Sequence, residues 1–208
     1  MENVSETGYG VDVAIRRADD LDKRLFALVV EQLGARVLDV GCGAGGCAAR
    51  LEAAGAQVVG LDIHDFSSEF SERAGGRSTF IEGDIRELNA LIADTYDFAL
   101  CQRTIHYVPY AEARTFLEVL RSRTTQKLFI SFSGLESDLA RTYPDTDKPV
   151  MERFATLGDE DQETFGITAP LCLYTKAEAE KLLRDSGWRI EESWQSAFGN
   201  SKLVATAV

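Results

Sequence analysis

Short apolar runs alternate with amphipathic segments along most of this chain. Five runs have the length and the β-branched content of buried strands, at residues 36–40, 57–62, 78–81, 96–101 and 127–132. Helical spacing or alanine-rich composition predicts helices at residues 11–33, 47–54, 86–93, 109–122 and 175–186. Strands that alternate with helices at this spacing predict an α/β fold, with a doubly wound parallel sheet and helices on both faces.

The C-terminal third departs from this rhythm twice. Residues 133–170 contain scattered prolines and glycines and far more acidic than basic side chains. A connection this long is usually functional or disordered, and it leaves the C-terminal end of a strand, so we expect an inserted substrate lid. Two further runs, at residues 188–194 and 198–206, predict an antiparallel hairpin. The expected sheet therefore has seven strands and is mostly parallel.

Length, composition and charge limit the class of protein. A chain of 208 residues with 45% hydrophobic and 27% charged residues suits one globular domain, residues 1–208, with residues 1–33 as a helical lead-in. The formal net charge of −12 argues against a nucleic-acid partner, because binding to the phosphate backbone relies on a basic face. We expect residues 1–10 to be a mobile lead-in.

The absence of membrane, signal-peptide and metal-ligand patterns in the sequence predicts the compartment and the metal content of the protein. No apolar run approaches the roughly 18 residues of a membrane helix, and the polar N-terminus has no signal-peptide pattern, so we expect a cytoplasmic protein without a membrane partner. The four cysteines form no C-x-x-C pair, and the chain has two histidines. This usage predicts reduced thiols and no metal site.

A glycine-rich turn is the strongest local signal. In RVLDVGCGAGG, a predicted strand runs into Gly41, Gly43 and Gly46, and a helix follows. Glycine has no Cβ, so a ligand can approach the backbone, and the helix points unpaired N–H groups at the ligand. The spacing G-x-G-x-x-G also fits a dinucleotide site, so the turn alone leaves the ligand open.

Acidic residues near three strands narrow that choice. Asp39 precedes the first glycine, where a carboxylate serves a pyrophosphate poorly but tolerates an ammonium or sulfonium group. Asp62 ends the second strand and can accept hydrogen bonds from both hydroxyls of a ribose. Asp84, in the tripeptide GDI, can accept a hydrogen bond from an adenine amino group or cap the helix that follows, and both roles can coexist.

Together these features resemble one superfamily. VLDVGCGAGG, the acid after the second strand, GDI, YDFALC and the terminal hairpin are similar to those of the class I, Rossmann-like, S-adenosylmethionine-dependent methyltransferases. The resemblance covers residues 37–101 in motif detail and the whole chain in layout. It implies a Rossmann-like sheet and S-adenosyl-L-methionine as the cofactor.

The resemblance also implies roles for the methionine end of the cofactor. Gly41, Gly43 and Gly45 pass the backbone beneath the methionine part, and Asp39 lies near its amino group. Gln102, just past the fourth strand, lies near the methionine tail.

The adenosine end has its own implied residues. Asp62 takes the ribose hydroxyls, and Ile63 packs on the adenine. Asp84 and the N–H group of Ile85 read the adenine edge.

The segment CQRTIHYVPY, after the fourth strand, carries the candidate catalytic chemistry. His106 is the candidate base, since an unperturbed pKa near 6.5 suits proton removal; a structural histidine that packs or caps the next helix is the alternative. Arg103 either binds an anionic substrate group or pairs with a nearby acid. Tyr107 and Tyr110 are expected to line the pocket.

The expected reaction is in-line methyl transfer to a small-molecule acceptor. The segment after the fourth strand lacks the Asp/Asn-Pro-Pro-aromatic tetrapeptide of DNA amino-methylating enzymes, and the acidic lid argues against a polyanion. Methylation of RNA or protein, a non-catalytic S-adenosylmethionine-binding subunit and a nicotinamide-dependent oxidoreductase remain as alternatives. The sequence leaves the methylated atom and the oligomeric state open.

Overall fold

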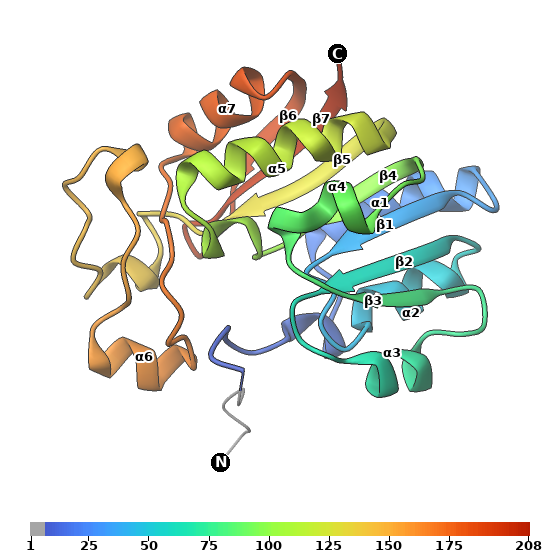
Figure 1. Ribbon diagram of the computed structural model, residues 1–208, viewed down its shortest axis with the longest axis horizontal. Helices are drawn as coiled ribbons and strands as arrows, with labels where there is room; N and C mark the ends of the chain where they lie inside the picture. Colours follow the sequence, from blue (N-terminus) through green and yellow to red (C-terminus); the bar gives the residue numbers. More distant parts are fainter. Residues whose placement is uncertain (1–6) are drawn as a thin grey trace.

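One seven-stranded sheet organises the computed structural model, which describes residues 7–208 (Figure 1). The strand order is β3-β2-β1-β4-β5-β7-β6. The strands are β1 (Arg36–Val40), β2 (Gln57–Asp62), β3 (Thr79–Glu82), β4 (Tyr96–Cys101), β5 (Thr124–Phe132), β6 (Trp188–Gln195) and β7 (Ser201–Ala207). β7 runs antiparallel to β5 and β6, and the other ladders are parallel. The predicted fold class is confirmed.

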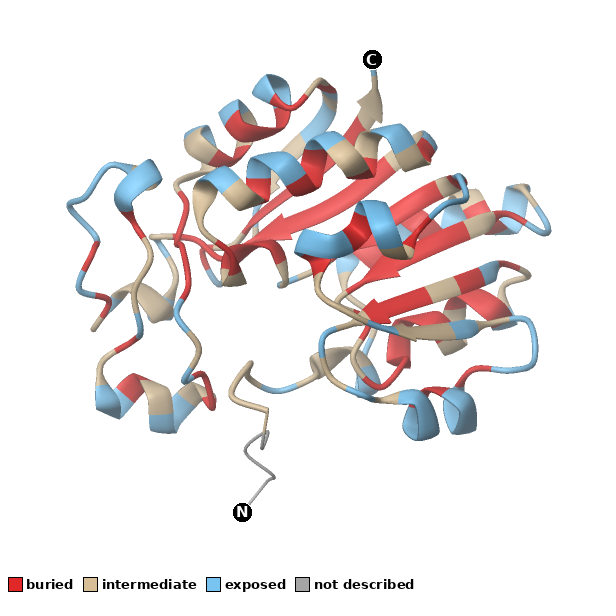
Figure 2. Ribbon diagram, viewed as in Figure 1, coloured by how far each residue is buried: buried red, intermediate tan, exposed pale blue. Residues whose placement is uncertain are grey.

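Helices cover both faces of this sheet (Figure 1). They are α1 (Asp20–Glu31), α2 (Gly46–Ala53), α3 (Ser67–Arg73), α4 (Leu88–Leu91), α5 (Tyr110–Arg123), α6 (Asp159–Phe165) and α7 (Lys176–Asp185). α1, α2 and α3 pack on one face, and α4, α5 and α7 pack on the other. In β1, the side chain of Val37 packs in the apolar core on the side of α1, α2 and α3, and that of Leu38 packs in the core on the side of α4, α5 and α7. Because both faces are buried (Figure 2), the central strands read as continuous apolar runs.

The N-terminal region differs from the predicted lead-in. The helix begins at Asp20 and not near residue 11, because Asp19 and Asp22 form a capping box that fixes its start. A short 3₁₀ turn, η1 (Val13–Ile15), precedes it. Residues 7–10 are held by backbone hydrogen bonds to residues 166–169, so the predicted mobility is wrong for them. Residues 1–6 of that prediction lie outside the described residues.

The register of the ladders places the candidate site. Val40 at the end of β1 is the partner of Leu61 in β2 and of Cys101 in β4. The residues that follow these strands, including Asp62 and Gln102, therefore emerge at one edge of the sheet, which is where ligands bind in open α/β sheets.

Residues 133–170 lie beyond this same edge, as the orange segment around α6 shows in Figure 1. They contain the 3₁₀ turns η4 (Asp138–Ala140) and η5 (Val150–Glu152) as well as α6. Tyr143, Leu157 and Leu171 belong to a small apolar core of their own. The inserted segment is thus a packed unit at the open end of the sheet.

The terminal hairpin is confirmed with one shift. Phe198, expected to begin the last strand, lies in the turn and is 64% exposed, and the strand begins at Ser201. The Ser196 Oγ accepts hydrogen bonds from the backbone N–H groups of Phe198 and Asn200, which fixes the turn. No helix within residues 7–208 is long and apolar enough to cross a membrane.

Candidate functional site

The glycine turn between β1 and α2 is shaped by close neighbours as well as by space for a ligand. Gly43 has φ of 50°, and a Cβ there would lie 2.4 Å from the Asp12 Oδ2. A Cβ at Gly41 would lie 1.8 Å from the Thr104 Oγ1, and both glycines line a large cavity. Gly45 lies against the Phe70 ring and is not on the cavity wall. Its predicted role beneath the ligand stays a prediction.

Asp62 stands beside this turn on the cavity wall. Its Oδ2 accepts a hydrogen bond from the Gly43 N–H (2.8 Å) and its Oδ1 one from the His64 N–H (3.1 Å). Burial nevertheless raises the pKa of this carboxyl group. Each oxygen keeps a free lone pair, so the pair can accept two further hydrogen bonds from a ligand.

Asp39 lies behind the turn and is 3% exposed. Its Oδ2 is buried and has no hydrogen-bond partner within the described part of the chain. Burial, and then the nearby carboxylates of Asp22 and Asp12, raise its pKa well above the usual range. Asp39 does not line the cavity.

Asp12 is a site residue that the sequence interpretation missed. Its Oδ2 accepts a hydrogen bond from the backbone N–H of Ala44 (3.1 Å), and its Oδ1 accepts one from that of Ala14. Arg50 on α2 holds the same segment by donating to the Ala14 carbonyl (2.7 Å). The N-terminal segment, residues 7–17, thus covers the glycine turn. Nothing in its local pattern distinguished Asp12 from the start of an amphipathic helix.

The predicted adenine contacts meet at the ends of β2 and β3. Ile63, Asp84 and Ile85 all line the cavity, and the Ile63 side chain is 41% exposed. The Asp84 Oδ1 accepts from the Arg86 N–H at the start of η2 (Ile85–Glu87), so the predicted capping role is confirmed. The Arg86 guanidinium also binds the Oδ2 and lowers the pKa of the carboxyl group.

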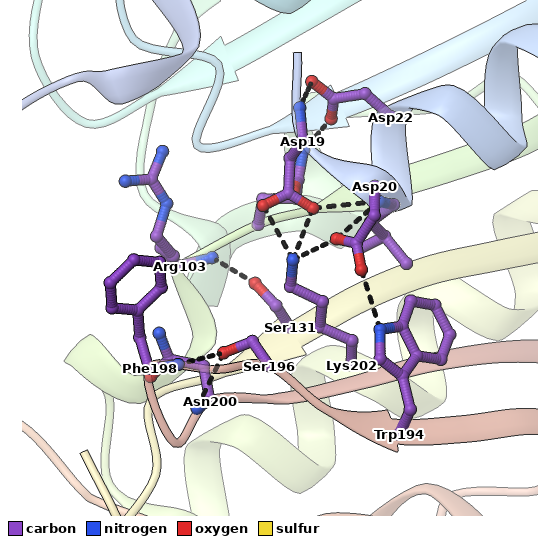
Figure 3. A network of polar contacts seen from close by, with 12 residues as sticks. Asp19, Asp20, Asp22, Arg103, Ser131, Trp194, Ser196, Phe198, Asn200 and Lys202 are labelled. Carbon is purple, nitrogen blue, oxygen red and sulfur yellow. Dashed lines mark hydrogen bonds and ion pairs between the residues drawn. The ribbon is translucent and has the colours of Figure 1, made fainter. Parts of the chain in front are cut away.

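Gln102 connects the cavity wall to a buried polar network. Its Nε2 donates to the Oδ1 of Asp22, which is 1% exposed, and the Asp22 Oδ2 accepts from the Asp19 N–H (3.1 Å). The Asp19 carboxylate binds the Lys202 ammonium at 2.6 and 2.7 Å (Figure 3). Of the three acids at the start of α1, Asp22 is therefore buried, whereas Asp19 and Asp20 are partly exposed. The carboxylates of Asp19 and Asp20 form ion pairs with the buried ammonium group of Lys202 on β7.

His106 lies in η3 (Ile105–Tyr107) on the cavity wall and is 2% exposed. Its two ring nitrogens are each 3.3 Å from the Ser133 Oγ. Burial, and then the positive charge of Arg103, lower the pKa of His106 to about 3. The expected value near 6.5 is therefore wrong, and the imidazole is neutral at physiological pH.

The cavity has a volume of about 1420 Å³. This exceeds the roughly 300–1,000 Å³ of a typical small-ligand site, so it has room for two molecules. One side is formed by the glycine turn and the ends of β2 and β3. The other is formed by the segment after β4, residues 7–17 and residues 133–170. Tyr107 is on this wall as predicted, whereas Tyr110 is not.

Comparisons with known proteins agree with this arrangement. Residues 37–126 match a family model described as a methyltransferase domain. The ubiquinone biosynthesis O-methyltransferase of Vibrio campbellii is 38% identical over 80 residues, which cover 36% of this chain and 34% of the relative. The magnesium-protoporphyrin O-methyltransferase of Synechocystis is 31% identical over 107 residues, or 48% of this chain and 45% of the relative. The chain therefore spans between a third and a half of the length of these curated relatives.

Solved structures share the fold. Magnesium protoporphyrin IX methyltransferase from Synechocystis, with bound S-adenosylhomocysteine, has a TM-score of 0.66 at 22% identity and covers 90% of this chain and 82% of its own. A 1,6-didemethyltoxoflavin-N1-methyltransferase from Burkholderia thailandensis was solved with bound 1,6-didemethyltoxoflavin and S-adenosylhomocysteine. It has a TM-score of 0.67 at 20% identity, and the match covers 95% of this chain and 79% of that enzyme. Residues 37–126 thus match a methyltransferase domain, and the chain as a whole shares the fold of solved methyltransferases that bind S-adenosylhomocysteine.

Proposed function

We propose that this chain transfers a methyl group from S-adenosylmethionine to a small-molecule acceptor. The observation that carries the proposal is that the glycine turn, Asp62 and the segment after β4 share one cavity large enough for both molecules. The relatives named as O-methyltransferases and the structures with bound S-adenosylhomocysteine support it.

The charges around the glycine turn fit a cationic cofactor. Asp12, Asp22, Asp39 and Asp62 lie near the turn, and Arg50 is the basic group that opposes them. S-adenosylmethionine carries a sulfonium and an ammonium group, which would offset this excess of negative charge. The buried Asp39 Oδ2, which has no hydrogen-bond partner within residues 7–208, is one acceptor that a nearby cation would stabilise.

The adenosine half fits the ends of β2 and β3. We assign the free lone pairs of Asp62 to the ribose hydroxyls and the exposed face of Ile63 to the adenine ring. Asp84 is already shared between the cap of η2 and Arg86, so the Ile85 N–H is the simpler contact for the adenine edge.

The chain's own residues must align the acceptor and exclude water. When bound, the sulfonium supplies a methyl group that is already activated for in-line displacement. Residues 133–170 act as the lid over the acceptor, together with residues 7–17. His106 is the candidate side chain at the reacting atom, where its neutral ring accepts a hydrogen bond from an acceptor O–H or N–H group.

A small acceptor is favoured over RNA or protein by the shape of the site. The segment after β4 opens into a cavity covered by two other segments and not onto a flat face. Acidic side chains such as Glu112 and Asp138 also lie on the wall, which disfavours a polyanion.

Calorimetry with S-adenosylhomocysteine tests this proposal, with NAD as the competing ligand. Asp62→Ala removes two charge-assisted hydrogen bonds to the ribose and should weaken binding by about thirtyfold or more. Asp65→Ala is the matched control, because Asp65 is a nearby exposed acid whose Oδ1 only caps α3 through the Ser67 N–H. Binding of NAD alone, or equal S-adenosylhomocysteine affinity in the parent and Asp62→Ala, would reject the assignment.

A further inference from the structure

Arg103 has a backbone conformation that needs an explanation. Within residues 7–208 it is the one non-glycine residue with positive φ, at 51°. This left-handed conformation is unfavourable for a residue with a Cβ, and such residues cluster at functional sites. Its N–H donates to the Ser131 Oγ (3.0 Å), which fixes the peptide to β5 (Figure 3).

The side chain of Arg103 is the second unusual feature. It is exposed and lines the cavity, and its guanidinium forms no hydrogen bond or ion pair in the described part of the chain (Figure 3). Arg86, on the same wall, is in contrast bound to Asp84 and lies 3.7 Å from Glu112. Asp138, also on the wall, makes no ion pair with Arg103. Of the two roles expected for Arg103, pairing with a nearby acid is therefore wrong.

The surroundings of Arg103 belong to the acceptor side of the cavity. Burial raises the pKa of Tyr107 and the charge of Arg103 opposes this, while burial and then Arg103 lower the pKa of His106, so the guanidinium is within electrostatic reach of both rings. Phe154, Phe165 and Phe198 line the same cavity. The cavity wall thus combines flat apolar surfaces with one planar cation that has no ion pair within the described residues.

From this arrangement we propose that the acceptor is an aromatic molecule with a carboxylate group, and that Arg103 binds that carboxylate. The proposal rests on the function proposed above and names its substrate class. A guanidinium binds a carboxylate through two parallel hydrogen bonds, which fixes the plane and direction of a ring. With the carboxylate at Arg103, the ring lies among the aromatic side chains and a separate O–H or N–H group faces His106. Arg103 is thus the residue that determines specificity for an acidic acceptor.

Binding of matched acids and esters tests the proposal. The probes are salicylate, 3,4-dihydroxybenzoate and 1-hydroxy-2-naphthoate, each compared with its methyl ester by calorimetry on the protein saturated with S-adenosylhomocysteine. In the parent, at least one acid should bind about tenfold or more tightly than its ester, as expected for a charge-assisted pair at a partly exposed site. Arg103→Met should remove this preference, and Arg103→Lys should retain part of it.

Two further variants keep the test decisive. Arg103→Gly removes the guanidinium without backbone strain, so it serves if the methionine variant does not fold. Arg189→Met removes an exposed charge from β6, away from the cavity, and should keep the full preference. A parent that binds S-adenosylhomocysteine but binds no acid better than its ester overturns the inference alone. The same follows if Arg103→Met and Arg103→Gly keep the preference. A parent that does not bind S-adenosylhomocysteine overturns the proposed function itself.

Discussion

The buried neutral imidazole of His106 should make the stability of this protein depend on pH in a defined way. The folded pKa is about 3, whereas an unfolded histidine titrates near 6.5. Between these values the unfolded chain binds a proton that the folded chain does not, so stability falls as the pH falls below about 6.5. Above that pH both states are neutral and the contribution is constant.

The size of the effect follows from these two pKa values. The contribution of His106 to the unfolding free energy should be about 2 kcal/mol lower at about pH 5 than at about pH 7. His106→Gln removes the titrating group, so the variant should lack this part of the acid dependence whatever its stability at neutral pH. The buried carboxyl groups titrate alike in both proteins and cancel in the comparison.

Urea unfolding at several pH values between about 5 and 8 measures this difference. His64→Gln is the control, since it removes the chain's other histidine from the same cavity and leaves His106 in place. It should retain the part of the slope that His106 contributes. If the unfolding free energies of the parent and His106→Gln fall in parallel between about pH 7 and pH 5, the neutral buried imidazole is refuted.

Two further substitutions test the contacts that hold the site. Lys202→Met leaves Asp19 and Asp20 without their cation and should lower the unfolding free energy in urea by about 2 kcal/mol. The loss is smaller than for a fully buried pair because the two acids are partly exposed. Unchanged stability would show that the ion pairs do not stabilise the fold. Gly43→Ala places a Cβ against Asp12 and imposes a left-handed alanine, so S-adenosylhomocysteine affinity should fall at least about tenfold with a lower Tm. Equal affinity and Tm would contradict the close packing of the N-terminal segment on the turn.

The fold was predictable from sequence because its signals are local. The strand at residues 36–40, its glycine turn and the acid at Asp62 are each legible within a few residues, and the parallel register then brings them to one edge. Thr175 and Glu178 form a capping box at the start of α7, which is a local signal for the helix predicted at residues 175–186.

The parts that escaped prediction depend on contacts between distant segments. Asp22 reads as one acid in a charged run, and its burial becomes evident only when Gln102 and Arg50 lie against it. Asp12 reads as the first turn of a helix, yet it binds the Ala44 N–H across 32 positions of the chain. Arg103 reads as an ordinary loop residue, since φ is a property of the folded backbone.

The two sides of the cavity are held by different kinds of contact, and this difference has a consequence for function. The glycine turn and Asp62 extend directly from paired strands, so their positions follow from the sheet. The covering segments are held partly by one another, since Tyr9 pairs with Ile167, and partly by the turn, since Asp12 accepts from the Ala44 N–H. We therefore expect substitutions in residues 133–170, which do not contact the turn, to alter the choice of the acceptor while leaving cofactor affinity nearly unchanged.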